Sequence, residues 1–352
     1  MGDKGVGRAF IGSFTSAGGR GIVTAEVDPD TGALTATGAV DTVPDPSYLA
    51  VRRTDAGPVL YAVSEAAPGA VAAYDVSGPV PRPLGDAVPV LGDGPTHLGV
   101  TDGHLLTANY TSGSVSVLPL APDGTPQAPS AVLRHEGSGP DPDRQGSPHA
   151  HQVLPDPSGR WVLGVDLGTD SVRISSLDAA TGALTPRGET ALPPGTGPRH
   201  LAFHPAGRLA YLLGELRPTV IVCRWDAEAG VLEPIGETPL VPGGADGPGV
   251  AVHPSAPVVS HDGRYLWTAV RGTDTITVFA LDEGGEKPAE VASVPCGGRW
   301  PRDLVLDPSG TRLYAANERS GDVTWFDVDG ATGLPTRAGS LAVPAASTVV
   351  FG

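Results

Sequence analysis

The feature that most constrains this chain is an internal repeat of about fifty residues. At intervals of 47 to 56 residues, a proline and a polar residue precede a short run of strand-forming residues. The six pairs are Pro46-Ser47, Pro95-Thr96, Pro148-His149, Pro198-Arg199, Pro254-Ser255 and Pro301-Arg302. Most are followed by a glycine turn, a second apolar run, a polar loop, a third run and a weaker fourth run. Four antiparallel strands at this period predict the blades of a β-propeller.

The two ends of the chain complete the repeat. Residues 9–34 supply a second, third and fourth strand without a first, and residues 346–351 form a lone strand. Paired together, they make one more blade and cover two open strand edges. The sequence therefore predicts an all-β fold, a single seven-bladed β-propeller domain over residues 1–352. Its four-stranded antiparallel blades are closed by pairing the C-terminal strand with the N-terminal blade.

Charge and composition narrow the partners and the compartment. A net charge of −16 disfavours nucleic acid and anionic membranes as partners. Residues 1–8 lack the apolar stretch of a signal peptide, and no run of eighteen apolar residues occurs. The two cysteines fit a reducing compartment and have no metal-site spacing. We therefore expect a cytoplasmic protein, as a monomer or a weak homo-oligomer.

The propeller topology predicts that two columns of polar side chains surround one mouth of the ring. The start of each first strand and the end of each second strand lie on the same face of an antiparallel meander. The first column is Ser47, Thr96, His149, Arg199, Ser255 and Arg302, and the second is Glu65, Tyr110, Asp166, Glu215, Arg271 and Glu318. The two asparagines of the chain, Asn109 and Asn317, stand beside the second column. We expect a functional site here, the alternative being solvated strand ends.

The third proline-led repeat departs from the pattern at a histidine. The equivalents of His151 in the other repeats are Leu49, Leu98, Leu201, Leu304 and Pro257. A histidine where the pattern has leucine is expected at a working site, and strand alternation puts His149 on the same face. The alternative interpretation of His151 is a hydrogen-bonded core histidine. His97 and His200 lie one step along their strands and are secondary candidates, whereas His253 is predicted to be structural.

Three arginines are expected to meet at the mouth. Arg199 and Arg302 begin first strands two blades apart, and Arg271 ends a second strand in the blade between them. Converging guanidinium groups suit a phosphate or a carboxylate. The alternative is that they form salt bridges between blades with Glu215, Glu318 and Asp166. Two long connections, residues 133–148 and 243–254, emerge on the same face and are candidate lids.

The chemistry available at this mouth combines histidine, carboxylate and arginine. The sequence has no Gly-x-Ser-x-Gly elbow, no phosphate-cradling glycine loop and no Cys/His metal spacing. A calcium site built on Asn109 and Asn317 is less well supported. The remaining set can activate water as a general base and stabilise an oxyanion on a strained ester.

At these residues the chain resembles the bacterial 6-phosphogluconolactonases of the propeller type, a lactonase family that also includes fungal carboxymuconate cyclases. The resemblance covers almost the whole chain. Its strongest segments are Pro148-His149-Ala150-His151-Gln152, Asp166-Leu167-Gly168-Thr169-Asp170, Gly197-Pro198-Arg199-His200, and Pro301-Arg302 with Ala316-Asn317-Glu318. The resemblance implies a catalytic group of one His, two Arg and one Glu. These fall here on His151 (or His149), Arg199, Glu215 and Arg271.

The chain departs from the family pattern beside two of these residues. It has Gly214-Glu215-Leu216 where the family has Asn-Glu-Leu, and Ala269-Val270-Arg271 where the family has Ser-Asn-Arg. The charged residue remains in both segments and the neighbouring amide is lost. The resemblance therefore implies the same chemistry with altered recognition of sugar hydroxyls.

Together these features predict a metal-independent, cofactor-free lactone hydrolase acting on 6-phosphogluconolactone or a related anionic sugar lactone. His or Glu would activate water while the arginines hold the anionic group. Substrate contacts are assigned to Arg302, Asn109, Asp166, His200, Asn317 and Glu318. The alternatives are a carboxymuconate-type cycloisomerase and a non-catalytic propeller that binds a ligand or partner. Converging His151 and Arg199 side chains in a deep pocket would favour catalysis, and a flat mouth would favour binding.

Overall fold

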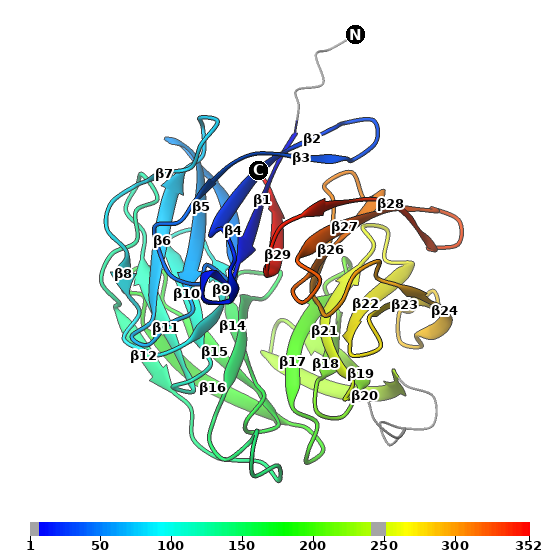
Figure 1. Ribbon diagram of the computed structural model, residues 1–352. Helices are drawn as coiled ribbons and strands as arrows, with labels where there is room; N and C mark the ends of the chain where they lie inside the picture. The colour runs from blue at the N-terminus through cyan, green and yellow to red at the C-terminus, as the bar shows by residue number, and fades with distance from the viewer. Residues whose placement is uncertain (1–6, 241–250) are drawn as a thin grey trace.

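The computed structural model describes residues 7–240 and 251–352. Seven antiparallel sheets form the blades of one closed ring, which confirms the predicted seven-bladed β-propeller (Figure 1). Six blades have four strands, and the blade that begins with β4 has a short fifth strand. The helical content of the described residues is the 3-10 turn η1 (Thr15–Ala17).

The blades share one strand order from the centre of the ring outward. The innermost strands are β29 (Ala346–Phe351), β4 (Leu49–Thr54), β9 (Pro95–Val100), β13 (Ala150–Pro155), β17 (Pro198–Phe203), β21 (His253–Val259) and β25 (Pro301–Leu306). The second strands are β1 (Gly7–Ser13), β5 (Gly57–Ser64), β10 (His104–Asn109), β14 (Trp161–Asp166), β18 (Leu209–Gly214), β22 (Tyr265–Arg271) and β26 (Arg312–Asn317). The third strands are β2 (Ile22–Val27), β6 (Ala70–Asp75), β11 (Ser114–Pro119), β15 (Ser171–Leu177), β19 (Thr219–Asp226), β23 (Thr275–Ala280) and β27 (Asp322–Val328). The outer strands are β3 (Leu34–Val40), β7 (Arg82–Pro83), β8 (Val88–Pro89), β12 (Ala131–Arg134), β16 (Leu184–Ala191), β20 (Val231–Pro239), β24 (Ala289–Pro295) and β28 (Pro335–Ala342).

The second strands are continuous apolar runs in the sequence because their side chains are buried on both faces. All residues of β10 and β22 are buried, because neighbouring blades cover both faces of each second strand. Hydrophobic clusters accordingly lie between blades, as where Leu163 of β14 packs with Leu212 of β18 and Trp225 of β19. The outer strands face water and are largely exposed, as in β16 and β28.

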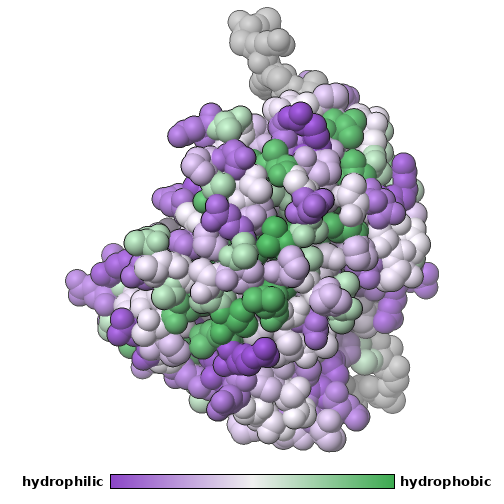
Figure 2. All heavy atoms as spheres, turned by 90° about the vertical axis from the view of Figure 1, so that its left-hand side faces the viewer, coloured by the Kyte–Doolittle hydropathy of each residue, from purple (hydrophilic) through white to green (hydrophobic). Residues whose placement is uncertain are grey.

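The side of the ring that carries β7 and β8 exposes both hydrophilic and hydrophobic residues (Figure 2). Figure 2 views the side of the ring that carries β7 and β8, and shows hydrophobic residues in small groups among hydrophilic ones. Across the described ranges, no helix is long and apolar enough to cross a membrane.

The ring closes as the sequence predicts. Strand β29 pairs antiparallel with β1, with Ile11 opposite Val349 and Phe10 opposite Val350. This pairing joins the last strand of the chain to the first and leaves neither as an open edge. A further contact holds β29 to the preceding blade, because Thr348 Oγ1 donates a 2.8 Å hydrogen bond to Asp303 Oδ2.

A β-bulge recurs at one place in the innermost strands, and it determines which side chains reach the mouth. In six of these strands the register against the second strand shifts after the first paired residue or, in β21, after the second. The extra residues lie at Thr96, His151, Arg199-His200, Ser255-Ala256, Arg302 and Ser347. A bulge bends its strand and re-aims a side chain, and bulges are common beside active sites.

The register corrects the predicted alignment of the third proline-led repeat. Ala150 pairs with Asp166 as Pro95 pairs with Asn109 and as Pro301 pairs with Asn317. The structural equivalent of the repeated proline is therefore Ala150, and His151 belongs to the first column in place of His149.

The same two-residue shift changes two other assignments. Val153, opposite Gly164, occupies the place of the leucines, so the expected leucine-to-histidine substitution at His151 was wrong. Asp166 corresponds to Asn109, and the second-column position falls on Leu167. The error arose because Pro148-His149 has the same residue pattern as the repeated proline pair. It stands two residues before the position at which the strand pairing begins.

Removing residues 346–352 should abolish cooperative folding or cause aggregation. The deletion takes away β29, exposes the edge of β1 and removes the hydrogen bond to Asp303. Circular dichroism melts and light scattering would measure both effects. Removal of exposed Gly352 alone is the control and should leave the melting midpoint unchanged. A deletion variant with wild-type melting temperature and solubility would show that the ends do not hold the ring together.

Candidate active site

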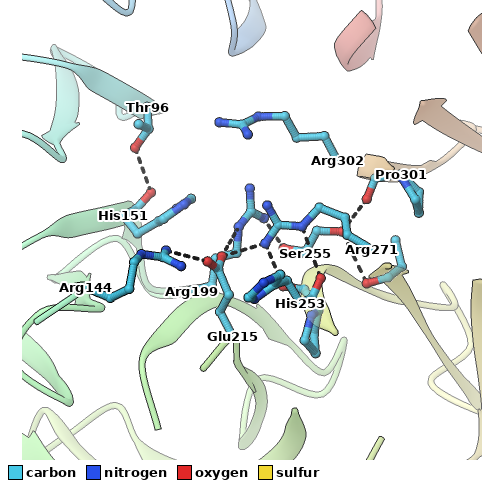
Figure 3. Close-up of polar contacts among 12 residues, drawn as sticks. Thr96, Arg144, His151, Arg199, Glu215, His253, Ser255, Arg271, Pro301 and Arg302 are labelled. Carbon is cyan, nitrogen blue, oxygen red and sulfur yellow. Dashed lines mark hydrogen bonds and ion pairs between the residues drawn. The ribbon is translucent and has the colours of Figure 1, made fainter. Parts of the chain in front are cut away.

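The carboxylate of a buried glutamate just after β18 contacts three arginines, which come from three parts of the chain. Glu215 Oε2 lies 2.6 Å from Arg271 Nη2 at the end of β22, and 3.0 Å from Arg199 Nε in the bulge of β17. Glu215 Oε1 accepts a 2.7 Å hydrogen bond from Arg144 Nη2, in the connection between β12 and β13. The Arg199 contact is an ion pair without a directed hydrogen bond. Figure 3 shows Arg144 and Arg271 reaching this carboxylate from opposite sides. We call these four residues the Glu215 cluster.

Backbone carbonyls at the start of β21 accept further hydrogen bonds from the two deeper arginines. Arg199 Nη1 donates to the carbonyl of Ser255, and Arg271 Nε donates to the carbonyl of His253 at 3.1 Å. The side chains of Arg199, Arg271 and Glu215 are 3%, 7% and 5% exposed. Buried guanidinium groups need such partners, and these carbonyls fix both arginines in place.

Three cations face one anion in the Glu215 cluster, so it remains positively charged within an acidic protein. Burial alone would raise the pKa of Glu215, but Arg271 and Arg199 hold it well below its usual range. Burial lowers the pKa of Arg199 and of Arg271, and both guanidinium groups still stay protonated near neutral pH. Glu215 is therefore a counter-ion and a poor proton acceptor.

Neutral imidazoles from three adjacent blades lie beside this positive charge. The ring centroid of His200 is 5.1 Å from that of His151 and 5.3 Å from that of His97, and Tyr48 stacks 4.1 Å from His97. Burial, and then the charge of Arg199, lower the pKa of His151 and of His200 well below the usual value. In the described part of the chain, His151 Nδ1 has no hydrogen-bond partner. His151 is thus a neutral imidazole whose Nδ1 is buried and unpaired.

Arg302 lies at the same mouth but belongs to a separate charge group. Its Nη1 is 3.3 Å from Glu318 Oε2 and its Nη2 is 3.8 Å from Glu65 Oε1. Its guanidinium carbon lies 4.7 Å from the centre of the Phe14 ring, and the second carboxylate oxygen of Glu65 accepts from the Ser47 hydroxyl. Only Arg199 and Arg271 of the three predicted arginines converge on one carboxylate. The predicted salt bridges with Glu215 and Glu318 are present, whereas Asp166 pairs with His135.

The structure does not place Asn109 and Asn317 where a substrate reaches them. Both are fully buried. Asn109 Nδ2 donates to the hydroxyl groups of Ser114 and Ser116, at 3.1 and 2.8 Å, and Asn317 Nδ2 donates to that of Thr324, at 3.1 Å. These amides tie the second strand of each blade to the third. Their assignment as substrate contacts is corrected to a structural role.

Asp166 and His149 also lie outside the cluster. Asp166 is fully buried, 2.6 Å from His135 Nδ1, and accepts the backbone N–H groups of His149 and Thr169 at 2.9 and 3.1 Å. The His149 ring stacks on Tyr110 with 4.4 Å between centroids, and its Nδ1 is 2.9 Å from the Tyr110 carbonyl. Of the two histidines offered for the catalytic role, the geometry favours His151.

Sequence reasoning missed Arg144, although it marked residues 133–148 as a candidate lid. Arg144 lies in a connection outside the repeat pattern, so its position in the sequence does not predict its contact with Glu215. Only the length of the connection indicated that this segment lies near the site. Of the second candidate lid, residues 243–254, the part from 243 to 250 lies outside the described residues.

A groove of about 710 Å³ lies on the opposite face of the ring, between β4 and the glycine turns of β9–β10 and β13–β14. Its arginine, Arg52, already donates to the carbonyls of Thr101 and Asp102. His104 and Asp156 are the other titratable side chains that line it, besides Asp102. The positive charge and the neutral imidazoles gather at the other face, and that face is the candidate active site.

The arrangement at the mouth can bind an anion, stabilise an oxyanion and accept a proton. Within residues 7–240 and 251–352, no group of three or more His, Cys, Asp or Glu side chains is arranged to hold a metal ion.

Comparison with known proteins places this chain in a family. A 6-phosphogluconolactonase of Bacillus subtilis is 34% identical over 351 residues, which cover 97% of each chain. A solved structure from Bacteroides fragilis has a TM-score of 0.91 at 29% identity, covering 100% of this chain and 99% of that one. The periplasmic gluconolactonase PpgL of Pseudomonas aeruginosa has a TM-score of 0.90 at 28% identity, covering 98% and 99%. The model of the family "Lactonase, 7-bladed beta-propeller" matches residues 8–351, and the chain therefore belongs to the seven-bladed β-propeller lactonases.

Proposed function

We propose that this lactonase is a metal-independent hydrolase of anionic sugar lactones, with 6-phosphogluconolactone as the substrate to test first. The observation that carries the proposal is the neutral His151 beside a buried cluster of three arginines and one glutamate. The name of the Bacillus subtilis relative supports the choice of lactone. A site with an excess of cations favours an anionic substrate over a neutral one.

His151 is the better candidate for the base. Glu215 has each oxygen bound by guanidinium groups, and its low pKa makes it a weak proton acceptor. His151 is neutral, and the described part of the chain offers no hydrogen-bond partner to its buried Nδ1. Its affinity for a proton is held down partly by Arg199, and an anionic substrate that binds among the arginines offsets that charge. Substrate binding would therefore strengthen the base.

The hydrolytic step follows from these roles. His151 takes a proton from a water molecule, whose oxygen attacks the lactone carbonyl carbon. The oxyanion that forms is stabilised by the positive charge of Arg199 and Arg271. The carbon–oxygen bond of the ring then breaks, and the leaving alkoxide takes the proton back from His151.

The state of the carboxylates supports a reaction without a metal ion. Glu215 is bound by three arginines, and Glu65 and Glu318 both face Arg302. The asparagines that a calcium site would use are buried among serine and threonine hydroxyl groups. The carboxylates of Glu215, Glu65 and Glu318 are thus already paired with arginines.

Hydrolysis of 6-phosphogluconolactone should exceed that of glucono-1,5-lactone and should be unchanged after dialysis against EDTA. The preference follows from the cation excess, and the insensitivity from a mechanism that uses only side chains. Proton release in weak buffer measures both reactions, with spontaneous opening as the blank. Activity that disappears with EDTA and returns with calcium would overturn metal independence. Conversion of a carboxylated five-membered lactone alone would favour a cycloisomerase.

The pH dependence should reveal His151 as the base. A base works when it is unprotonated, so activity is lost as the pH falls through its pKa. In the free enzyme that pKa lies well below 6.5, so kcat/KM should stay constant as the pH falls past 6.5. With an anionic lactone bound, the acidic limb of kcat should lie at higher pH, because the substrate offsets the charge of Arg199.

Two variants check this assignment. His151→Gln should lower kcat by about 10²–10⁴-fold. His135→Gln changes a buried histidine that pairs with Asp166 away from the Glu215 cluster. It should lower the melting temperature and leave the pH dependence of kcat and of kcat/KM unchanged. A limb in kcat/KM above pH 6.5, or an unchanged kcat in His151→Gln, would remove His151 from the mechanism.

A further inference from the structure

The three arginines of the Glu215 cluster differ in what a ligand can reach. The side chain of Arg144 is 37% exposed, whereas Arg199 and Arg271 are 3% and 7% exposed. Arg199 and Arg271 also donate hydrogen bonds to the carbonyls of Ser255 and His253, respectively. Arg144 is hydrogen-bonded through Nη2 to Glu215, and a guanidinium group has five N–H donors. Arg144 therefore presents accessible donors beside the Glu215 cluster.

The backbone that carries Arg144 is fixed by the residue that follows it. Gln145 is fully buried, and its Nε2 donates to the Leu167 carbonyl at 2.9 Å and to Asp170 Oδ1 at 2.8 Å. Asp170 in turn accepts the N–H groups of Gly195 and Gly197, both at 2.7 Å. Arg144 is thus a half-exposed side chain on an anchored loop. Little backbone ordering is needed when it binds a ligand.

Arg302, another cation of the mouth, is less suited to an anion. Arg302 faces the carboxylates of Glu318 and Glu65, which oppose its charge from two sides. The Glu215 cluster has the opposite balance, three cations for one anion. An anionic group that enters the mouth is attracted to the side of the Glu215 cluster, where Arg144 is the exposed cation.

We propose that Arg144 contacts the phosphate of a phosphorylated lactone and so determines the preference for phosphorylated over neutral substrates. A planar guanidinium group matches two phosphate oxygens at once. Glu215 stays held by Arg199 and Arg271 if Arg144 turns from it to the phosphate, so the buried pair keeps its place. Arg144 is thus a specificity-determining residue, distinct from His151 and from the arginines at the carbonyl. This inference rests on the proposed function.

The test compares Arg144→Ala and Arg144→Lys with the wild type on 6-phosphogluconolactone and glucono-1,5-lactone. In Arg144→Ala the KM for the phosphorylated lactone should rise about 10- to 100-fold with little change in kcat, because binding energy is lost equally in ground and transition state. The KM for the neutral lactone should change less than about threefold. Arg144→Lys should fall between, since it keeps the charge and loses the fork.

Arg217→Ala is the matched control. Arg217 pairs with Glu237 at 2.9 Å in the same blade as Glu215, with both side chains exposed, and its loss should leave both KM values unchanged. Equal losses on the two lactones, or a fall in kcat alone, would show that Arg144 acts only by positioning Glu215 and would overturn the proposal. So would an unchanged KM for the phosphorylated lactone.

A binding measurement separates this inference from the proposed function. If the wild type hydrolyses neither lactone, the proposed function fails, and titration calorimetry with 6-phosphogluconate and with gluconate still tests Arg144. The proposal stands if the wild type binds 6-phosphogluconate at least about tenfold more tightly than Arg144→Ala does, with gluconate unaffected. Equal affinities, or no binding of 6-phosphogluconate by the wild type, would overturn it.

Discussion

The mouth of this propeller depends on the compensation of buried positive charge by Glu215. Burying an ion costs several kcal/mol, and Arg199 and Arg271 are both almost fully removed from water. Glu215 and the carbonyls at the start of β21 offset that cost. Burial of the ring, and the positive charge that remains because the compensation is incomplete, keep His151 neutral. The same ion pairs that hold adjacent blades together therefore also set the protonation state of the proposed base.

The bulges of the innermost strands place the side chains of the candidate active site. Each extra residue sends a side chain toward the mouth without disturbing the ladder farther along the strand. In β17 the bulge lies at the consecutive residues Arg199 and His200, which contribute to the charge cluster and to the histidine cluster. In β13 it selects His151. One repeated irregularity thus brings an imidazole and a guanidinium group from adjacent blades to the same place.

The sequence predicted the ring because the fold depends on local, periodic signals. Prolines, glycine turns and apolar runs recur at a constant spacing, and the strand of residues 346–351 was identified with its observed bounds. The register within a blade was predicted less well. Pro148-His149 matches the repeat but precedes the strand, and only the pairing of Ala150 with Asp166 shows this.

Whether a polar residue beside the mouth can reach a substrate depends on its burial, and the residue type does not predict that burial. Asn109 and Asn317 are polar like their neighbours, yet they point into the blades. The same register explains the family asparagines that this chain lacks. Gly214 and Val270 pair with Pro198 and Pro254 as Asn109 pairs with Pro95, so their side-chain positions also lie inside blades. A Cβ atom at Gly214 would lie 2.5 Å from the Arg217 carbonyl oxygen, which leaves no room for asparagine. The expectation that these two losses alter substrate recognition therefore lacks structural support.

The substitution Glu215→Gln tests the central role of this carboxylate most directly, with the free energy of unfolding as the measurement. Three arginines would lose their counter-ion, two of them buried, and the account predicts a loss of about 3–5 kcal/mol together with a loss of lactonase activity. Glu318→Gln is the matched control, because its partner Arg302 is more exposed, and it should cost at most about 1 kcal/mol. Equal, small losses in the two variants would contradict the account.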